Sequence, residues 1–484
     1  PDDVINVKVC QYPNISVGDV VEVYGKVELW GISVCEANHY IKKVSPESIN
    51  RYYWIKTYGG PGWDDAYAVT IAPNGDIIVA GDTRSFGVGG RDIWVLRLDP
   101  NGYIKWQKTY GGKYDDHIGA LAVTSSGDII VAGITNSFGV DKNSIWILRL
   151  DSNGNIKWQK TYGNKYDGYI ETMTIAPNGD IIVAINNNDG IWVLRLDSNG
   201  YIKSSKILNC ILNLNDSRDI RWYNRVGITP NANNIIIATN VYSLTELTTI
   251  VTLLDLNRNI KWQKTYEGFD CRLLFPENNG DIFIIGQYDY TGDDIILRLD
   301  SNGNIKLSKK LLEWAVAAYP VYMAAAKAPN GDIIIVGFLW SSGDFPMCSL
   351  ILRLDSNGNM KWIKTYDGPD LWSWDGAHAV TIAPNGDIIV AGFTTSFGAG
   401  YGDFWILKLP PDGSISNCPI QEDVNNVVMV NTVINVSTTS NMVLVIRDVN
   451  VTVMNTNAIA KDTNAIVQTQ CSMLTPSPKC CPCE

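Results

Sequence analysis

The sequence predicts an all-β protein: a seven-bladed β-propeller flanked by a small N-terminal β domain and a C-terminal β-rich segment. Two turn motifs each recur seven times along the 484 residues. The strand that should close the last copy of the repeat stands instead before the first copy. Units of about 50 residues with four strand-like stretches each are typical of propeller blades.

The first recurring motif is an Asn-Gly-Asp turn that follows a short alternating stretch. Asn-Gly sequences adopt the positive φ angles that tight hairpins need. Successive copies are 46 to 55 residues apart, and the fourth copy is degenerate. The seven copies are Asn74-Gly75-Asp76, Ser126-Gly127-Asp128, Asn178-Gly179-Asp180, Asn233-Asn234-Ile235, Asn279-Gly280-Asp281, Asn330-Gly331-Asp332 and Asn385-Gly386-Asp387.

The second motif is Leu-Arg-Leu-Asp-x-Asn-Gly, an apolar strand that ends in another hairpin turn. Five copies are clear and two are weaker. They are Leu96–Gly102, Leu148–Gly154, Leu194–Gly200, Leu297–Gly303 and Leu352–Gly358, with the weaker Leu253–Asn259 and Leu407–Gly413.

Each unit contains four stretches with strand character and turn residues between them. In the first unit these stretches are Ala68–Ala72, Asp76–Ala80, Asp92–Leu98 and Ile104–Tyr110. The fourth-strand sequence also occurs early, at Trp54–Gly60, and is absent after the last unit. We therefore expect the early strand to complete the last blade, which closes the ring by hydrogen bonds and removes a free edge.

The docking pattern of the repeat allows a resemblance to be named. Leu98, Asp99, Gly102 and Trp106 resemble the tryptophan-docking motif of quinoprotein-type propellers. Over residues 52 to 415, the whole unit is similar to the secreted bacterial and archaeal repeats typified by the SBBP family. That likeness implies a scaffold fold that serves many roles. Quinoproteins would further imply eight blades, a calcium site and a catalytic Asp, and these have no counterpart here, so we expect no cofactor.

Candidate catalytic residues are scarce. The three histidines, His39, His117 and His378, have no Ser or Asp partners at a recognisable spacing. His117 and His378 occupy near-equivalent places just after an acidic cluster, at the start of a first strand, and we interpret them as polar residues at the channel mouth. We therefore expect no enzymatic activity and no catalytic residues.

Acidic residues recur just before the first strand of several units. Their carboxylates either cap turns by accepting backbone N–H groups or form an oxygen ring that could bind Ca²⁺. We favour turn capping and assign no metal site. The residues are Asp64, Asp65, Asp115, Asp116, Asp167, Asp270 and Asp375.

Composition and charge limit the cellular compartments and the classes of partner that the chain is expected to have. The net charge is −11, and no Lys/Arg cluster offers a nucleic-acid surface. No apolar run approaches the roughly 20 residues of a membrane span. The chain opens at Pro1 and has ten cysteines, which favours a mature secreted chain with disulfides. Four sequons are predicted N-glycosylation sites: Asn14, Asn215, Asn435 and Asn450.

Residues 1–50 are predicted to form a separate small β domain. Val4–Cys10, Val20–Leu29 and His39–Val44 alternate like strands, and VGDVVEVYGKVE resembles a strand pair of an OB-type barrel. The basic and aromatic groove that nucleic-acid binding needs is missing. A bond between Cys10 and Cys35 would stabilise so small a core. The propeller follows over residues 51–418.

Residues 419–470 form a second flanking region, rich in Val, Ile, Asn and Thr. This aliphatic segment makes a poor core alone, so we expect it to pair with the N-terminal domain or with another copy of the chain. Residues 471–484 form a Pro- and Cys-rich tail, for which disulfides are expected and a zinc site is the alternative. The tail cysteines are Cys471, Cys480, Cys481 and Cys483, and a weaker prediction pairs Cys210 with Cys271.

These observations lead to two functional hypotheses. The first is a non-catalytic extracellular structural protein that self-assembles through its terminal β segments into a cell-surface filament or lattice. The second is a monomeric cell-surface adhesin or glycan-binding module that uses the propeller face.

Overall fold

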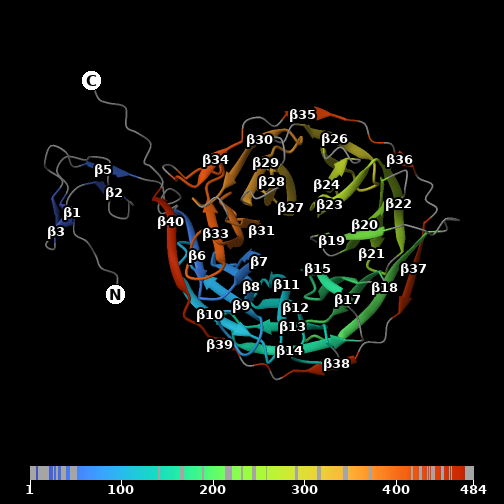
Figure 1. The fold of residues 1–484 in the computed structure, drawn as a ribbon, viewed down its shortest axis with the longest axis horizontal. Helices are drawn as coiled ribbons and strands as arrows, with labels where there is room; N and C mark the ends of the chain where they lie inside the picture. The colour runs from blue at the N-terminus through green and yellow to red at the C-terminus, as the bar shows by residue number, and fades with distance from the viewer. Residues whose placement is uncertain are drawn as a thin grey trace. The chain divides into compact units, whose positions relative to one another are not determined.

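The structure is a computed structural model that describes most of residues 52–474 and five short strands before them (Figure 1). In the first 51 residues it describes 7–8, 21–24, 27–28, 31–33 and 40–43. From 52 to 474 the ranges left out are 140–141, 164–167, 188–189, 213–220, 230–232, 243–246, 258, 289–292, 313–317, 342–346, 370–372, 416–417, 425–427, 433, 435, 438–441, 449–451, 457 and 459.

The predicted all-β fold with a seven-bladed propeller is confirmed. Seven antiparallel sheets surround a central channel, and neighbouring first strands contact each other around the whole ring (Figure 1). The first strands, which line the channel, are β7 (Asp64–Ile71), β11 (Asp116–Val123), β15 (Gly168–Ile175), β19 (Arg221–Ile228), β23 (Phe269–Pro276), β27 (Ala318–Lys327) and β31 (Asp375–Ile382). We number blades 1 to 7 in this order.

The second and third strands form the buried middle of each blade. The second strands are β8 (Ile77–Thr83), β12 (Ile129–Thr135), β16 (Ile181–Asn187), β20 (Asn234–Tyr242), β24 (Ile282–Tyr288), β28 (Ile333–Ser341) and β32 (Ile388–Thr394). The third strands are β9 (Asp92–Leu98), β13 (Ser144–Leu150), β17 (Gly190–Leu196), β21 (Leu247–Asp255), β25 (Asp293–Leu299), β29 (Cys348–Leu354) and β33 (Asp403–Leu409).

The fourth strands lie outside these and include the strand that closes the ring. The early strand β6 pairs antiparallel with β33, so it completes blade 7 as the sequence predicts. The fourth strands are β10 (Ile104–Tyr110), β14 (Ile156–Gly163), β18 (Ile202–Leu212), β22 (Ile260–Glu267), β26 (Ile305–Leu312), β30 (Met360–Tyr366) and β6 (Tyr52–Gly59).

The docking motif joins blades 7, 1, 2, 4 and 6 each to the blade that follows it. Trp106 of blade 1 donates its indole N–H to the Ser152 carbonyl of blade 2 at 2.9 Å, and the Tyr110 hydroxyl bonds to the Gly154 carbonyl at 2.6 Å. Gly154 has φ +76°, and a Cβ there would lie 2.9 Å from the Trp106 ring. The glycine is therefore required both by the turn and by the close approach of the tryptophan.

The residues after the propeller repeats form a belt around it. We use "belt" for residues 418–474, whose seven strands each add a fifth strand to one blade. Going along the chain they pair with β30, β26, β22, β18, β14, β10 and β6, so the belt makes one full turn in the direction opposite to the blades (Figure 1). Its strands are β34 (Gln421–Asp423), β35 (Val428–Asn431), β36 (Val436–Ser437), β37 (Met442–Asp448), β38 (Thr452–Asn455), β39 (Lys461–Asp462) and β40 (Ile466–Leu474).

The belt corrects the predicted partner of residues 419–470. The expectation that they pair with the N-terminal domain or with another copy was wrong, because they pair with the outer edges of their own propeller. Fourth strands expose unpaired backbone N–H and C=O groups, which an extended aliphatic segment can satisfy without a core of its own. The belt up to Ser472 thus belongs to the same compact unit as the blades, Tyr53–Ser472.

A short repeat within the belt matches the spacing of the blades. Thr456 and Thr463 begin the two Thr-Asn-Ala-Ile copies. Trp146 of blade 2 donates its indole N–H to Thr456 Oγ1 at 3.2 Å, and Trp94 of blade 1 donates to Thr463 Oγ1 at 3.0 Å. Seven extended residues span at most about 25 Å, which here carries the belt from one blade to the next.

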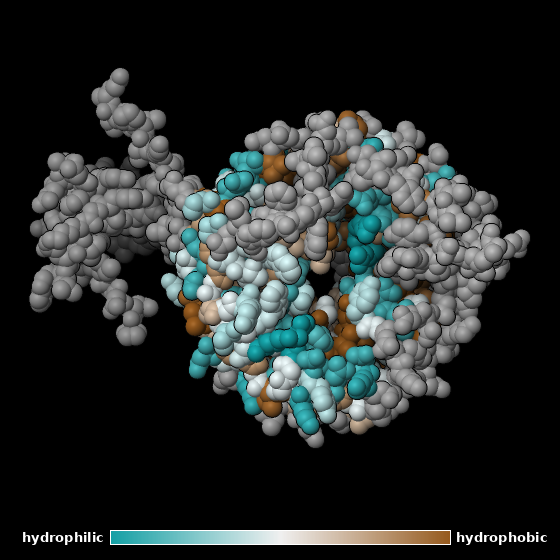
Figure 2. Space-filling view, in the orientation of Figure 1, coloured by the Kyte–Doolittle hydropathy of each residue, from teal (hydrophilic) through white to brown (hydrophobic). Residues whose placement is uncertain are grey.

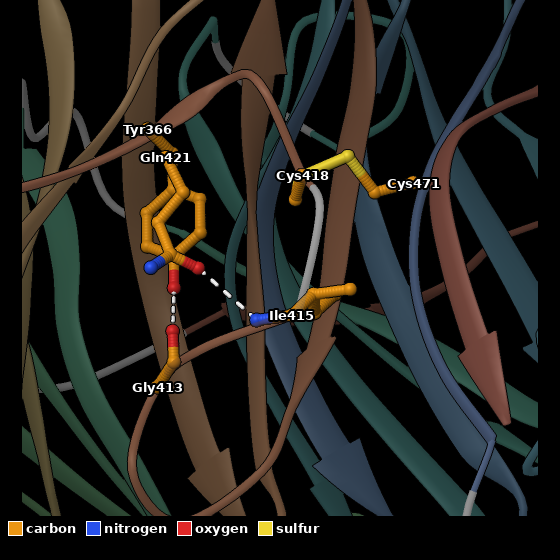
Figure 3. The surroundings of a disulfide bond; sticks show 6 residues. All are labelled: Tyr366, Gly413, Ile415, Cys418, Gln421 and Cys471. Atoms are coloured by element: carbon orange, nitrogen blue, oxygen red, sulfur yellow. Dashed lines mark hydrogen bonds between the residues drawn. A yellow bond between two sulfur atoms is a disulfide. The ribbon is translucent and has the colours of Figure 1, made fainter. Parts of the chain in front are cut away.

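A disulfide closes the belt on itself. Cys418, just before β34, bonds to Cys471 on β40, 53 residues later, with Cα atoms 5.6 Å apart (Figure 3). Beside it, the Ile415 amide donates to Gln421 Oε1 at 3.1 Å. The predicted tail cysteine Cys471 is therefore paired within the chain, to a residue that the sequence analysis left unassigned.

The predicted bond between Cys210 and Cys271 is absent, because Cys271 is a buried free thiol. Cys210 lies on β18, an outer strand of blade 3, whereas Cys271 lies on β23, the innermost strand of blade 5. Cys10, Cys35, Cys480, Cys481 and Cys483, and the sequons at Asn14, Asn215, Asn435 and Asn450, lie outside the described residues.

The N-terminal unit, which also takes in residues 473–484, contains two small sheets. One has the order β1-β4-β3 and the other pairs β2 with β5. Their bounds fall within or beside the strands expected from the sequence, while the OB-type barrel stays a prediction. The strands are β1 (Val7–Lys8), β2 (Val21–Tyr24), β3 (Val27–Glu28), β4 (Gly31–Ser33) and β5 (Tyr40–Lys43).

Candidate functional site: the central channel and its loop face

The two faces of the propeller differ in their connections. Strands alternate in direction within a blade, so first and third strands both begin at one face, which we call the loop face. It carries long connections such as 84–91 and 395–402, whereas the opposite turn face carries the tight Asn-Gly hairpins. Binding residues concentrate on loops held by a rigid scaffold, so the loop face is the first place to look.

Buried aspartates hold the loop face together in blades 1, 2 and 7. Asp64 opens β7 and accepts hydrogen bonds from Thr83 Oγ1 at 2.5 Å, Ser85 Oγ at 2.7 Å and the Gly60 amide at 2.9 Å. Asp375 makes the equivalent three bonds in blade 7, and Asp116 makes the threonine and glycine bonds in blade 2 but accepts the Ser137 amide in place of a serine hydroxyl. The turn-capping interpretation of these three acidic residues is therefore confirmed.

The other predicted acidic residues are spread around the ring. Asp115 accepts the Arg91 amide at 2.8 Å, and Asp270 pairs with Arg272 at 2.7 Å. Asp167 lies outside the described residues. In the described part of the chain, no three His, Cys, Asp or Glu side chains converge in a way that could hold a metal ion. The oxygen ring considered from the sequence is thus not assembled there.

Two histidines bridge blade 1 to its neighbours near the channel mouth. His117 of blade 2 lies 2.8 Å from Asp82 Oδ2, and Asp82 Oδ1 also accepts the Ile118 amide at 2.9 Å. His378 of blade 7 lies 3.1 Å from Asp65 Oδ1, close enough for an ion pair but not aligned as a hydrogen bond. Both histidines are thus polar residues on the channel wall, as interpreted from the sequence. His39 lies outside the described residues.

An aromatic row runs between these groups. Tyr67 stacks on His378 with ring centres 5.0 Å apart, and Phe393 lies 5.4 Å from His378 on the other side. Burial, reinforced by the Asp65 and Asp82 carboxylates, raises the pKa of the Tyr67 phenol. Tyr67 therefore stays protonated and can donate a hydrogen bond at physiological pH.

The sequence analysis missed a ring of residues inside the channel. In six first strands the pairing register skips one residue, a β-bulge that leaves an extra residue out of the ladder. Each bulged residue stands seven positions before the Asn or Ser of the following turn, a spacing that could have revealed the ring. The residues are Tyr67, Gly119, Glu171, Arg272, Met323 and His378.

The bulge ring differs in chemistry from blade to blade, although the rest of the repeat is regular. Blades 7 and 1 contribute the stacked His378 and Tyr67. Blade 3 contributes Glu171 and blade 5 contributes Arg272. The first strand of blade 4 has no bulge, but its Arg225 pairs with Glu171 at 3.3 Å. On the side of blades 3 to 6 the channel widens into a cavity of about 430 Å³. Figure 2 shows hydrophilic residues bordering the central opening, with hydrophobic residues between them.

Comparisons with known proteins agree with the propeller fold. The family described as "Domain of unknown function (DUF5122) beta-propeller" matches residues 72–103, within blade 1. No curated protein matches the chain. The finer resemblance to SBBP-like or quinoprotein-type repeats stays a prediction.

Solved structures similar to this chain belong to proteins of several kinds. A protein of unknown function from Bacteroides caccae is 13% identical, with 64% of this chain and 93% of that chain covered and a TM-score of 0.35. Extracellular domains 1–2 of Drosophila semaphorin 1a are 10% identical (73% and 87% covered, TM-score 0.38). Prolyl oligopeptidase B from Galerina marginata is 8% identical (78% and 51% covered, TM-score 0.44). Such distant likenesses carry no argument about function.

Proposed function

We propose that the chain is an extracellular, non-catalytic binding protein whose loop face binds glycans at blades 7, 1 and 2. The supporting observation is a set of large aromatic side chains exposed at this face. Trp374 is 54% exposed, Tyr401 78% and Tyr114 54%. Flat aromatic rings stack on the apolar faces of sugars, and exposed aromatic residues commonly mark binding surfaces.

The backbone beneath these aromatic residues is anchored. The Trp374 amide donates to Thr395 Oγ1 at 2.7 Å, the Tyr401 amide to the Gly62 carbonyl at 3.2 Å, and the Tyr114 amide to Ser137 Oγ at 2.9 Å. A platform that is ordered before binding loses less entropy when a ligand arrives. This arrangement supports a binding role for the loop face.

Polar groups near the channel mouth suit sugar hydroxyls, which both donate and accept hydrogen bonds. Arg91 is 28% exposed and lies 3.8 Å from Asp82, whose other partner His117 is 36% exposed. The disulfide of the belt supports an oxidising, extracellular location.

A glycan array probed with the full chain tests this proposal. We expect selective binding that Trp374→Ala and Tyr401→Ala each weaken at least tenfold. Tyr103→Ala is the matched control, because Tyr103 is equally exposed at 64% but lies on the turn face. Absence of glycan binding, or binding that survives both loop-face substitutions, would overturn the proposal.

Self-assembly into a filament or lattice is the second candidate function, now through the outside of the belt. β40 is the last strand of its sheet, and it exposes Ile466 by 54% and Val467 by 41%. An edge strand with exposed apolar side chains can add to a second copy. Light scattering on a sizing column should then show large species for the full chain and a monomer for the I466K/V467K variant. A monomeric full chain would contradict this candidate.

A further inference from the structure

The channel contains a cavity that shares no lining residue with the proposed glycan surface. It lies against β15, β19, β23 and β27, the first strands of blades 3 to 6. Its lining begins at the level of the bulge ring and runs along the strands toward the turn face. A volume of about 430 Å³ is within the range of small-molecule sites.

Two arginines bring hydrogen-bond donors to the cavity. Arg225 pairs with the lining residue Glu171, and Arg272 pairs with Asp270, so each guanidinium has one carboxylate partner and further N–H donors. Clustering two arginines in an acidic protein at a concave site is what recognition of an anion requires.

Arg225 is held in place but keeps donors available. In the part of the chain that the structure describes, its guanidinium bonds only to Glu171, through Nη1 at 3.3 Å. Glu171 is itself fixed by the Val226 amide, and Arg225 opposes the rise in the pKa of this carboxyl that burial causes. Glu171 thus orients the guanidinium, and among the described residues the remaining N–H groups of Arg225 have no protein partner and can donate to a ligand.

Arg272 presents a second set of donors on the neighbouring strand. Its Nη2 atom lies 2.7 Å from Asp270 Oδ2 and 3.5 Å from Gln287 Oε1. Among the described residues, Nε and Nη1 of Arg272 have no protein partner, and half of the side chain is exposed. A planar carboxylate could therefore accept hydrogen bonds from both arginines.

The remainder of the lining is mostly apolar. It includes Met173, Leu274, Phe275, Pro276 and Met323. A small inorganic anion would leave this surface in contact with water, whereas an apolar body attached to the anion would bury it. At roughly 25 cal/mol per Å² of apolar surface, such burial contributes substantially to affinity.

We propose that this cavity binds an organic carboxylate with an apolar body, with the carboxylate on Arg225 and Arg272 and the body against the apolar wall. The inference is independent of the glycan proposal, because the two sites share no residue. Its chemistry predicts preference for anionic over neutral or cationic ligands of the same shape.

Calorimetric titration of the full chain with octanoate, octanol and octylammonium tests this. We expect octanoate to bind at least tenfold more tightly than octanol and octylammonium to bind most weakly. Equal binding of octanoate and octanol, or no binding of octanoate, would overturn the proposal.

Variants locate the site within the cavity. Arg272→Gln should weaken octanoate binding at least tenfold. Because it also removes the ion-pair partner of the buried Asp270, thermal unfolding of the variant is measured beside binding to establish that it folds. The double variant E171Q/R225Q removes both charges of the pair together, so no buried charge is stranded, and should weaken binding similarly. Arg84→Gln, on an exposed loop of blade 1, is the matched control and should bind as the unmodified chain does. Octanoate affinity that is unchanged in both cavity variants would also overturn the proposal.

Discussion

Removing the disulfide that closes the belt should destabilise the propeller by a calculable amount. The bond between Cys418 and Cys471 closes a loop of 53 residues around the seven blades. In the chain-entropy treatment, closing a loop of this length removes about 14 cal/mol/K of entropy from the unfolded chain, or about 4 kcal/mol at 25 °C. We expect the C418S/C471S variant to lose up to this much of its free energy of unfolding.

The loss should begin at the belt. Without the bond, a belt of short edge strands can open from either end while the blades stay folded, because the blades have their own core and ring closure. Guanidinium unfolding measures the stability, and limited proteolysis should cut the variant within residues 419–474 at protease concentrations that leave the unmodified chain intact. Cys348→Ser, which removes a thiol that takes no part in the bond, is the control.

An unchanged unfolding midpoint together with unchanged resistance of the belt would refute this reasoning. That outcome would mean that the edge pairing alone holds the belt in place. Substitution is preferable to a reducing agent here, since eight further cysteines are present in the chain.

Two further predictions concern the belt and the loop face. Thr456→Val should lower stability by about 1 kcal/mol, measured as a shift in the guanidinium midpoint, because the buried Trp146 indole N–H loses its acceptor; an unchanged midpoint would contradict the assigned bond. Burial raises the pKa of the Asp92 carboxyl to about 7, whereas the same carboxyl in the unfolded chain titrates near pH 4. Between these two pH values the folded chain holds a proton that the unfolded chain has released. The free energy of unfolding should therefore fall as the pH rises from about 4 to 7. Asp92→Ser, which copies Ser144 at the same position of β13, should reduce this dependence in thermal unfolding measured across pH, while the raised pKa values of Asp367 and Asp403 keep part of it. An unaltered slope would count against the assignment to Asp92.

The propeller could be predicted because its information is local and repeated. The Asn-Gly turns, the apolar third strand and the docking tryptophan each specify a structure within one unit or between neighbours. Because the fourth-strand sequence Trp54–Gly60 stands before the first unit, it predicted that the ring closes on the last blade, and β6 does pair with β33 there. Each turn motif is a weak indication of a blade, and its sevenfold recurrence made the prediction specific.

The belt's partner could not be derived from sequence in the same way. An edge is recognised by backbone N–H and C=O groups, which every residue type carries, so the belt sequence does not identify which edge it pairs with. Thr456 and Thr463 bond to equivalent tryptophans of neighbouring blades, so their separation of seven residues matches the distance between two blades. That spacing alone was compatible with several structures. The bond to Cys418 followed from the full turn of the belt, a long-range feature that spacing does not reveal.

The channel residues were missed for a different reason. A search for catalytic or metal-binding combinations looks for residues close in sequence, whereas the bulge ring takes one residue from each of six blades. Glu171 and Arg272 are 101 positions apart in the sequence and come to line the same cavity only because the blades are arranged in a ring. Aligning the units on their turns would have shown that this position varies in chemistry within an otherwise regular repeat.

The belt also changes the relative weight of the two functional hypotheses. A filament built by strand addition needs free edges, and the belt occupies the outer edge of all seven blades. Assembly must then use the outside of the belt, where described strands such as β38 and β39 are only 4 and 2 residues long. Short edge strands are one way in which proteins avoid unwanted pairing. The belt reaches the loop face, where the Gln468 side-chain amide donates to the Gly398 carbonyl at 3.3 Å, but it leaves Trp374, Tyr401 and Tyr114 exposed. A binding role at that face is therefore compatible with the belt, and for this reason we place binding before assembly.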